Sequence, residues 1–258
     1  MNAQGAGFAA ALDMLEHAGT LAAWPDGTGR THRVGVPGMS VIPKALGAGL
    51  DIRQNMQVTR LVPDAGGWLL QLQDSTLRAA RVVVTVPAPQ VAGLLGDDHP
   101  LVASLGTVQM APCLTLMAAV TAPAPFITRK DADDPLSWIA HDNAKPGRPQ
   151  GDRALWVAQA GETFSLAHLE DDPAILTARM LPLLCDRIGA DTANVSHAAS
   201  HRWQFARVTQ PLGQPFLRSA DATLYLGWDW CLGARVEAAW DSGTAIAHDL
   251  MTQDNRVC

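Results

Sequence analysis

A run of β-branched residues, Val82–Val86, restricts the folds that this chain can adopt. The run holds four valines and Thr85 directly after Arg81, and side chains that branch at Cβ favour strands over helices. Because Arg81–Val86 is nearly all apolar, we expect a strand that is covered on both faces, as in the centre of an α/β sheet. Pro87 and Pro89 end this strand, and a short helix is expected over Gln90–Leu95.

The remaining patterns divide the chain into an α/β part and a mostly antiparallel part. Hydrophobic spacing and turn residues predict the helices and strands. The helices are Gly7–Ala18, Val41–Leu50 with Ser40 as its N-cap, Pro173–Ile188 and Glu237–Leu250; the strands are Asp51–Leu61, Trp68–Gln73, Cys113–Val120, Ser137–His141, Ala154–Ala160, His197–Phe205 and Thr223–Gly227. We expect one domain from residues 30–108 and 220–258, and a second from residues 1–29 and 109–219.

Composition disfavours several classes of protein. The formal net charge is −6 over 258 residues, which argues against a broad basic face for nucleic acid. No stretch reaches the roughly 18 consecutive apolar residues of a membrane helix, and the N-terminus lacks the pattern of a signal peptide. We therefore expect a cytoplasmic protein with no membrane or nucleic-acid partner. The four cysteines are far apart, so neither a disulfide framework nor a metal site is expected.

One short motif is similar to a dinucleotide-binding fingerprint. Gly5–Ala10 has the sequence GAGFAA, which matches G-x-G-x-x-A, and Asp26 follows at about the 20-residue spacing of that fingerprint. A fingerprint needs a strand before its first glycine, and residues 1–4 are too few and too polar to form one. We therefore interpret these positions as small residues of a terminal helix.

Asp229 follows an apolar strand and precedes a turn and a helix that begins near Val236. A helix N-terminus offers free N–H groups and the positive end of the helix dipole, which suit a phosphate or a ring carbonyl. The Asp229 carboxylate can accept hydrogen bonds from sugar hydroxyls, or it can cap the next helix. Both interpretations remain open.

His201 and Trp203 alternate on a predicted strand and therefore share one face. Ser165 and His168 are three residues apart and can share a surface, but no third residue completes a hydrolase triad. A structural role is favoured for these histidines. The chain has eight tryptophans beside one tyrosine; an indole can form the wall of a site for a flat heterocycle, although most tryptophans pack in cores.

Five segments, in order along the chain, resemble the bacterial renalase-like branch of the flavin-containing amine oxidases. They are Val34–Ser40 (VGVPGMS), Val82–Gln90, Ser137–Ala140 with Lys145–Arg148, His201–Trp203 and Asp229–Gly243 (DWCLGARVEAAWDSG). The resemblance extends over about residues 8–247, and an ordered series of this kind is more specific than any one member.

This resemblance implies an α/β fold in which a partial FAD domain of the glutathione-reductase type is interleaved with a substrate domain built on an antiparallel sheet. By position, Val58 would contact the adenine through its backbone and Asp229 would lie near the ribityl or pyrophosphate group. Arg235 and Val236 would bring the last helix to the flavin. Proteins of this kind move a hydride from an amine or a reduced nicotinamide to FAD, which oxygen reoxidises.

FAD is thus the expected cofactor and a small molecule the expected substrate, with His201 and Trp203 as candidate catalytic residues. Two departures from the family pattern leave alternatives open. Family members begin with a strand–G-x-G-x-x-G–helix–strand unit, and we expect this chain to start after it; Trp228 also stands where the family has glycine. The alternatives are a cofactor-free descendant, acting as a small-molecule binding protein or a non-redox enzyme, and a subunit whose partner chain supplies the missing unit.

Overall fold

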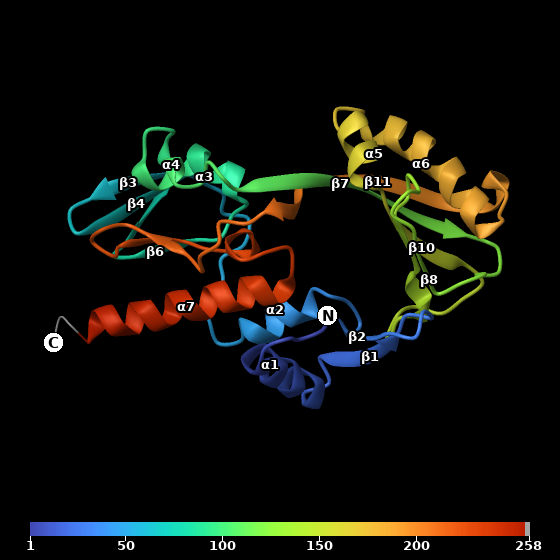
Figure 1. Ribbon diagram of the computed structural model, residues 1–258, viewed down its shortest axis with the longest axis horizontal. Coiled ribbons are helices and arrows are strands. Elements are labelled where there is room, and N and C mark those ends of the chain that lie inside the picture. Colours follow the sequence, from blue (N-terminus) through green and yellow to red (C-terminus); the bar gives the residue numbers. More distant parts are fainter. Residues whose placement is uncertain (256–258) are drawn as a thin grey trace. The chain divides into compact units, whose positions relative to one another are not determined.

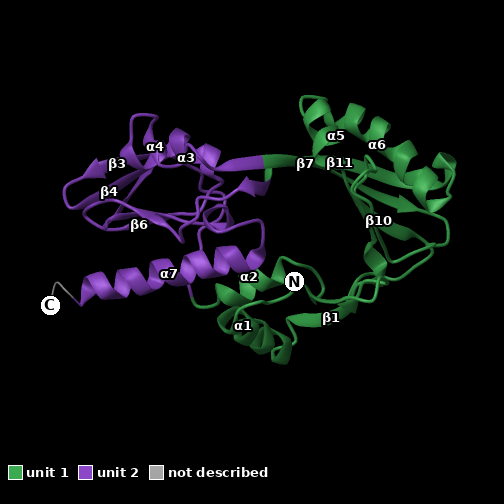
Figure 2. Cartoon of the chain, in the orientation of Figure 1, with its two compact units in different colours: residues 1–49, 111–206 green, residues 50–110, 207–258 purple. Residues whose placement is uncertain are grey.

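The computed structural model describes residues 1–255, which form two compact units (Figures 1 and 2). Unit 1 consists of residues 1–49 and 111–206, and unit 2 of residues 50–110 and 207 onward. Compared with the expected domains, residues 30–49 lie in unit 1, and residues 109–110 and 207–219 lie in unit 2. Each unit is therefore assembled from two separate stretches of the chain.

Unit 1 is built on a five-stranded sheet with the strand order β11-β7-β10-β9-β8. Its strands are β7 (Gln109–Val120), β8 (Thr128–Lys130), β9 (Trp138–His141), β10 (Ala154–Gln159) and β11 (Val195–Gln210), of which β7 and β11 continue into residues of unit 2. β10 pairs antiparallel with β7 and with β9, and β9 pairs antiparallel with β8. The antiparallel sheet predicted for this part of the chain is confirmed.

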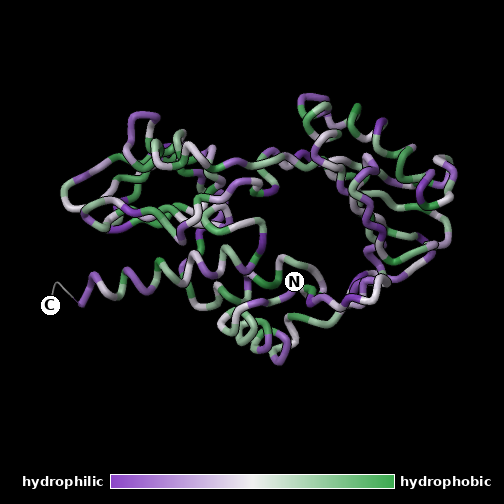
Figure 3. Tube along the Cα trace, in the orientation of Figure 1, coloured by the Kyte–Doolittle hydropathy of each residue, from purple (hydrophilic) through white to green (hydrophobic). Residues whose placement is uncertain are grey.

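Helix α6 (Pro173–Ile188) covers one face of this sheet and has the bounds that its hydrophobic spacing predicts. Its buried stripe comprises Leu176, Met180, Leu184 and Ile188. The stripe belongs to one core with Leu114, Leu116 and Trp156 from the strands, and Figure 3 shows hydrophobic and polar residues alternating along the helix. The shorter helix α5 (Glu162–Ala167) and the 3₁₀ turns η1 (Asp142–Ala144) and η2 (Thr192–Asn194) complete this part of unit 1.

The first 49 residues of unit 1 form helix α1 (Ala6–His17), a hairpin of β1 (Leu21–Pro25) and β2 (Thr31–Gly35), and helix α2 (Val41–Leu46). In the GAGFAA motif, Gly5 is the N-cap of α1 and Ala6–Ala10 form the start of the helix. The interpretation of these positions as small residues of a helix is therefore confirmed. Trp24 and Val34 of the hairpin pack on Ala140 of β9, so the hairpin covers that end of the sheet.

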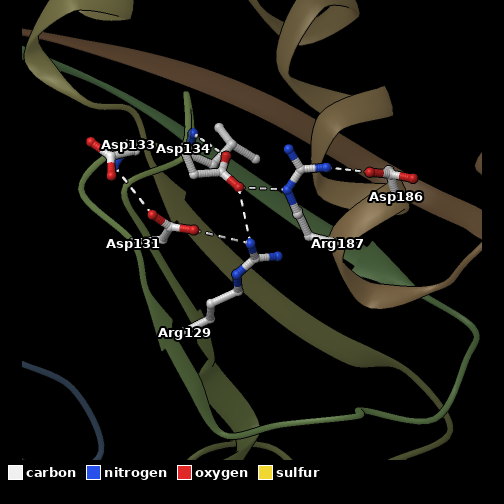
Figure 4. A network of polar contacts seen from close by, with 7 residues as sticks. Arg129, Asp131, Asp133, Asp134, Asp186 and Arg187 are labelled. Carbon is white, nitrogen blue, oxygen red and sulfur yellow. Dashed lines mark hydrogen bonds and ion pairs between the residues drawn. The ribbon is translucent and has the colours of Figure 1, made fainter.

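A polar network ties α6 to the loop between β8 and β9 (Figure 4). Asp134, whose side chain is only 4% exposed, accepts hydrogen bonds from Arg187 of α6 and from Arg129 Nη2 at 3.2 Å. The Leu136 N–H donates to its other oxygen at 2.9 Å. Both oxygens of this buried carboxylate are thus occupied, as its burial requires.

Unit 2 contains a β-meander and a second sheet, with helices on either side. The meander is β3 (Val58–Asp64), β4 (Gly67–Leu72) and β5 (Thr76–Ala79), and the second sheet has the order β12-β13-β6, from β6 (Val82–Val84), β12 (Leu217–Arg218) and β13 (Leu224–Leu226). Its helices are α3 (Ala88–Leu95), α4 (Pro100–Ala103), the 3₁₀ turn η3 (Asp229–Cys231) and α7 (Val236–Asp254). β6 and β13 are parallel, as in α/β sheets.

The valine run forms strand β6, but its expected central position is wrong for the residues that the structure describes. β6 pairs with β13 on one side only, so it lies at the edge of its sheet. Val82 and Val84 face the larger core of unit 2, whereas Val83 points the other way and is 43% exposed. Tyr225, its register partner on β13, is fully buried and packs with Ile246 of α7. On the face of this sheet that lies beside α7, the side chain from β13 is therefore buried, whereas the side chain from β6 is exposed.

Two other expectations are corrected. The strand expected over Asp51–Leu61 begins only at Val58, because its partner β4 ends with Leu72, which pairs with Val58. The helix expected over Val41–Leu50 stops at Leu46, with Gly47 as its C-cap. Ser40 adopts the helical conformation and forms no side-chain cap, so the capping prediction for Ser40 is wrong. In residues 1–255, no helix has both the length and the apolar character needed to cross a membrane.

Candidate functional site

The segment around Asp229 in unit 2 joins the end of a buried strand to the start of the longest helix. Strand β13 is fully buried and is followed by Gly227, where an added Cβ would lie 2.5 Å from Ile246 Cδ1 and 2.7 Å from Ser242 Oγ. Only glycine lets the backbone pass this close to α7. The Trp228 N–H then donates to Ser242 Oγ at 3.1 Å, which fixes the position from which Asp229 starts η3.

The carboxylate of Asp229 is a partly buried charged group in this segment. Its Oδ1 is buried and has no hydrogen-bond partner within residues 1–255. Burial raises the pKa of Asp229 above its ordinary value, and the Trp230 N–H opposes this only in part. A buried acceptor without a donor is an uncommon and costly arrangement in a native protein, and a ligand with hydroxyl donors would satisfy it.

Asp229 does not cap helix α7. The N-cap residue of α7 is Arg235, and its side chain forms no capping hydrogen bond. The capping interpretation for Asp229 is therefore wrong. The positive end of the dipole of this 19-residue helix lies at its first turn, which also holds the buried Glu237. Hydrogen bonds from Gly233 N–H to the Asp229 carbonyl and from Arg235 N–H to the Gly233 carbonyl, both 2.8 Å, hold the connecting turn.

Three of the four predicted cofactor residues thus lie in one short segment: Asp229, Arg235 and Val236. Arg235 and Val236 are exposed at the start of α7. Val58 lies on a different element of the same unit, at the start of β3, where it is half-buried and packs against the core. The sequence located the segment, but it gave no sign that one carboxylate oxygen would be buried without a donor.

His201 and Trp203 lie on β11 in unit 1, and their rings meet edge to face with centroids 4.3 Å apart. Ser200 and Arg202 donate to the carbonyls of Pro173 and Leu169, at and just before the start of α6. Because side chains alternate along a strand, His201 and Trp203 point to the opposite face. Their shared face is confirmed, and the Trp203 side chain is 54% exposed there.

Sequence reasoning missed Met117, which belongs to the same open face of the sheet. Its neighbours Leu116 and Ala118 are buried in the core under α6, so Met117 points away from α6 and is exposed. The alternation of core and non-core residues along β7 was the signal that would have found it. The open face therefore offers an aromatic ring, an imidazole and a thioether.

The pair Ser165 and His168 has a structural role. Ser165 is fully buried and its hydroxyl accepts a hydrogen bond from the Leu114 N–H at 3.1 Å. His168 Nδ1 lies 3.1 Å from Asp171 Oδ2. The structural interpretation of this serine and this histidine is confirmed.

A separate hollow in unit 1 has a volume of about 480 Å³ and is lined in part by His141, Asn143 and Arg153. His141 lies against the Trp156 ring at a centroid distance of 5.2 Å. Burial lowers the pKa of His141, and Asn143 and Asp142 oppose this effect. No group of three or more His, Cys, Asp or Glu side chains in residues 1–255 is arranged to hold a metal ion. Cys258, one of the four cysteines of the sequence, lies outside the described residues.

Comparison with known proteins agrees with this architecture. The sequence profile of the flavin-containing amine oxidoreductases matches residues 21–251. Among solved structures, a protein assigned as a protoporphyrinogen oxidase from Exiguobacterium sp. 255-15 is similar, with a TM-score of 0.68 and 16% identity over 87% of this chain and 53% of that one.

Two further solved structures have the same fold. A triple mutant of putrescine oxidase gives a TM-score of 0.64 and 15% identity over 86% of this chain and 54% of that one. Cyclohexylamine oxidase from Brevibacterium oxydans IH-35A gives 0.60 and 13% over 83% and 53%. The chain thus spans about half the length of these solved structures.

Proposed function

Because this chain belongs to the family of flavin-containing amine oxidoreductases, we propose that it binds FAD at the Asp229 segment and serves in hydride transfer from an amine or a reduced nicotinamide. The single observation that carries this proposal is the buried Asp229 Oδ1, which has no donor in the part of the chain that the structure describes. The resemblance to the renalase-like branch supports both classes of hydride donor. The described residues fit a flavin, since a hydroxyl-bearing chain would supply the missing donor to Asp229.

The chain's own residues would bind and position such a cofactor. Gly227 leaves room for a close backbone approach at the end of β13, and the positive end of the α7 dipole favours an anionic or carbonyl oxygen nearby. By the resemblance, Val58 would contact the adenine, and Arg235 and Val236 would bring α7 to the flavin. The chemistry that a bound flavin would supply is acceptance of a hydride and reoxidation by oxygen.

Within unit 1 itself, the open face of the sheet supports binding of a small amine. The exposed Trp203 indole offers a ring face that attracts a cationic group. His201 lies in edge contact with that ring and supplies an imidazole that can form a hydrogen bond to a polar group of the substrate. We therefore propose Trp203 as a substrate-binding residue and His201 as its polar neighbour.

Titration of the purified chain with FAD tests the proposal. Flavin fluorescence and the visible flavin absorbance report binding directly. Replacing Asp229 by alanine removes a hydrogen bond to a charged group, so affinity should fall about tenfold to a hundredfold. Asp241→Ala, on the exposed side of α7, is the matched control and should bind as the unchanged chain does. Absence of flavin binding by the unchanged, folded chain would refute the proposal.

A second candidate function, that of a subunit which binds flavin together with another polypeptide, is favoured by β6. This strand has an unpaired outer edge in the described part of the chain, and Val83 is exposed beside the buried Tyr225. Parallel strands are normally covered on both faces. Under this candidate, purified copies of the chain associate with one another through that edge, and the chain binds no flavin by itself. Val83→Lys should then weaken the association, measured by light scattering, without lowering the unfolding temperature.

A further inference from the structure

Trp228 presents an exposed indole from a fixed backbone. Its side chain is 41% exposed, although Gly227 before it and Trp230 two residues after it are buried. The Trp228 N–H donates to Ser242 Oγ, which is buried, and its carbonyl accepts from the Cys231 N–H at 3.1 Å. The indole therefore projects from a point that cannot shift without breaking two hydrogen bonds.

Exposed apolar side chains recur along this same segment. Leu232 and Val236 are exposed on either side of the turn that leads into α7, and Val236 is 54% exposed. Within nine residues of sequence, three exposed apolar residues thus accompany one carboxylate whose buried oxygen has no donor among the described residues. Small-molecule sites combine apolar side chains with a few polar groups that the ligand satisfies.

We propose that Trp228 is a binding residue that stacks on a flat heterocycle of the ligand held at Asp229, and so selects nucleotides with a planar ring over sugar phosphates without one. This inference rests on the proposed flavin site. An indole is large, flat and electron-rich, and it loses little conformational freedom because its backbone is already fixed. Stacking of a nucleic-acid base on an aromatic side chain changes affinity by about fivefold to a hundredfold.

Two rings of FAD have this chemistry, the isoalloxazine and the adenine, and separate ligands distinguish them. Riboflavin carries only the isoalloxazine ring, and ADP carries only the adenine ring. Riboflavin, ADP and FAD are therefore titrated into the protein in three separate experiments. Tryptophan emission and flavin fluorescence are the measurements, because a stacked indole quenches both. The ligand whose affinity depends on residue 228 identifies the ring that stacks.

Two variants separate ring stacking from apolar bulk. Trp228→Phe keeps an aromatic ring and should bind FAD within a few-fold of the unchanged chain. Trp228→Leu keeps apolar bulk without a ring, and its FAD affinity should fall about tenfold, within the range for lost stacking. Thermal unfolding followed by circular dichroism should be the same for all three proteins, because the side chain is exposed.

The outcomes distinguish the two levels of the argument. If the unchanged chain binds none of FAD, riboflavin and ADP, the proposed function fails, and the stacking role fails with it. If the unchanged chain binds FAD and Trp228→Leu binds it equally well, the stacking role alone is wrong. Tighter binding by Trp228→Leu would show that the indole obstructs the site, which also overturns the inference.

Discussion

Replacing Asp134 by alanine is expected to destabilise unit 1 by about 3 kcal/mol. The Asp134 side chain is 4% exposed and holds Arg187, Arg129 and the N–H of the buried Leu136 (Figure 4). Removing one partner of a fully buried pair costs about 3–5 kcal/mol. Both arginines keep some contact with water, which lowers that cost, but the buried Leu136 N–H also loses its acceptor, which adds about 1–3 kcal/mol.

A neighbouring aspartate provides the matched control. Asp131 also pairs with Arg129, at 3.3 Å, but its side chain is 42% exposed. Exposed ion pairs contribute about 0–1 kcal/mol, so Asp131→Ala should change the free energy of unfolding by less than about 1 kcal/mol. Urea unfolding at neutral pH measures both variants. Equal losses for the two aspartates would refute the argument that burial makes the difference.

The same network predicts a dependence on pH. Burial acts to raise the pKa of Asp134, but the Arg187 hydrogen bond, the Leu136 N–H and the arginine charges outweigh it and hold that pKa below its ordinary value. A lowered pKa in the folded state stabilises the fold above the unfolded pKa of about 4. This contribution is lost as the pH falls through the lower pKa that Asp134 has in the folded state. The difference in the free energy of unfolding between Asp134→Ala and the unchanged chain should therefore shrink in acid.

Three further predictions follow from other sites. Gly227→Ala places a Cβ against Ile246 and Ser242, so the free energy of unfolding of unit 2 should fall by about 1–3 kcal/mol. Gly243→Ala meets no atom within 4 Å and lies inside α7, so it should raise stability by up to about 1 kcal/mol in the same urea assay. Burial lowers the pKa of His141, so the folded state resists protonation of this imidazole. The free energy of unfolding should therefore be highest above about pH 6.5 and should fall as the pH decreases below that value. His141→Gln should flatten this dependence in unfolding midpoints measured at several pH values.

The predictable parts of the fold are those in which neighbouring residues decide the outcome. Helix α6 was predicted at its observed bounds because its apolar stripe and its C-terminal glycine are local signals. Strand β3 was predicted too long because the length of a strand depends on where its partner ends, and β4 pairs only as far back as Val58. The valine run identified β6 as a strand, but what lies on its outer edge depends on residues elsewhere.

The candidate site divides in the same way. The order of residues placed Asp229 between a strand and a helix N-terminus, and the structure agrees. The missing donor at Asp229 Oδ1 depends on how η3 and α7 pack, and no pattern along the chain encodes it. The exposure of Trp228 is a property of packing as well, since its neighbours Gly227 and Trp230 are buried.

The division of each unit between two stretches of chain affects how the protein is made. Strands β6 and β13 pair directly, with Val82 opposite Leu224, so a ribosome must finish most of the chain before this parallel pair can form. Pairing between residues so far apart in sequence is slow, because the intervening chain must first be ordered or looped out. Unit 1 has α6 and nearly all of its sheet by residue 206, although β11 runs on to Gln210. We therefore expect unit 1 to fold during synthesis, while strand β6 of unit 2 waits for its partner β13, Leu224–Leu226.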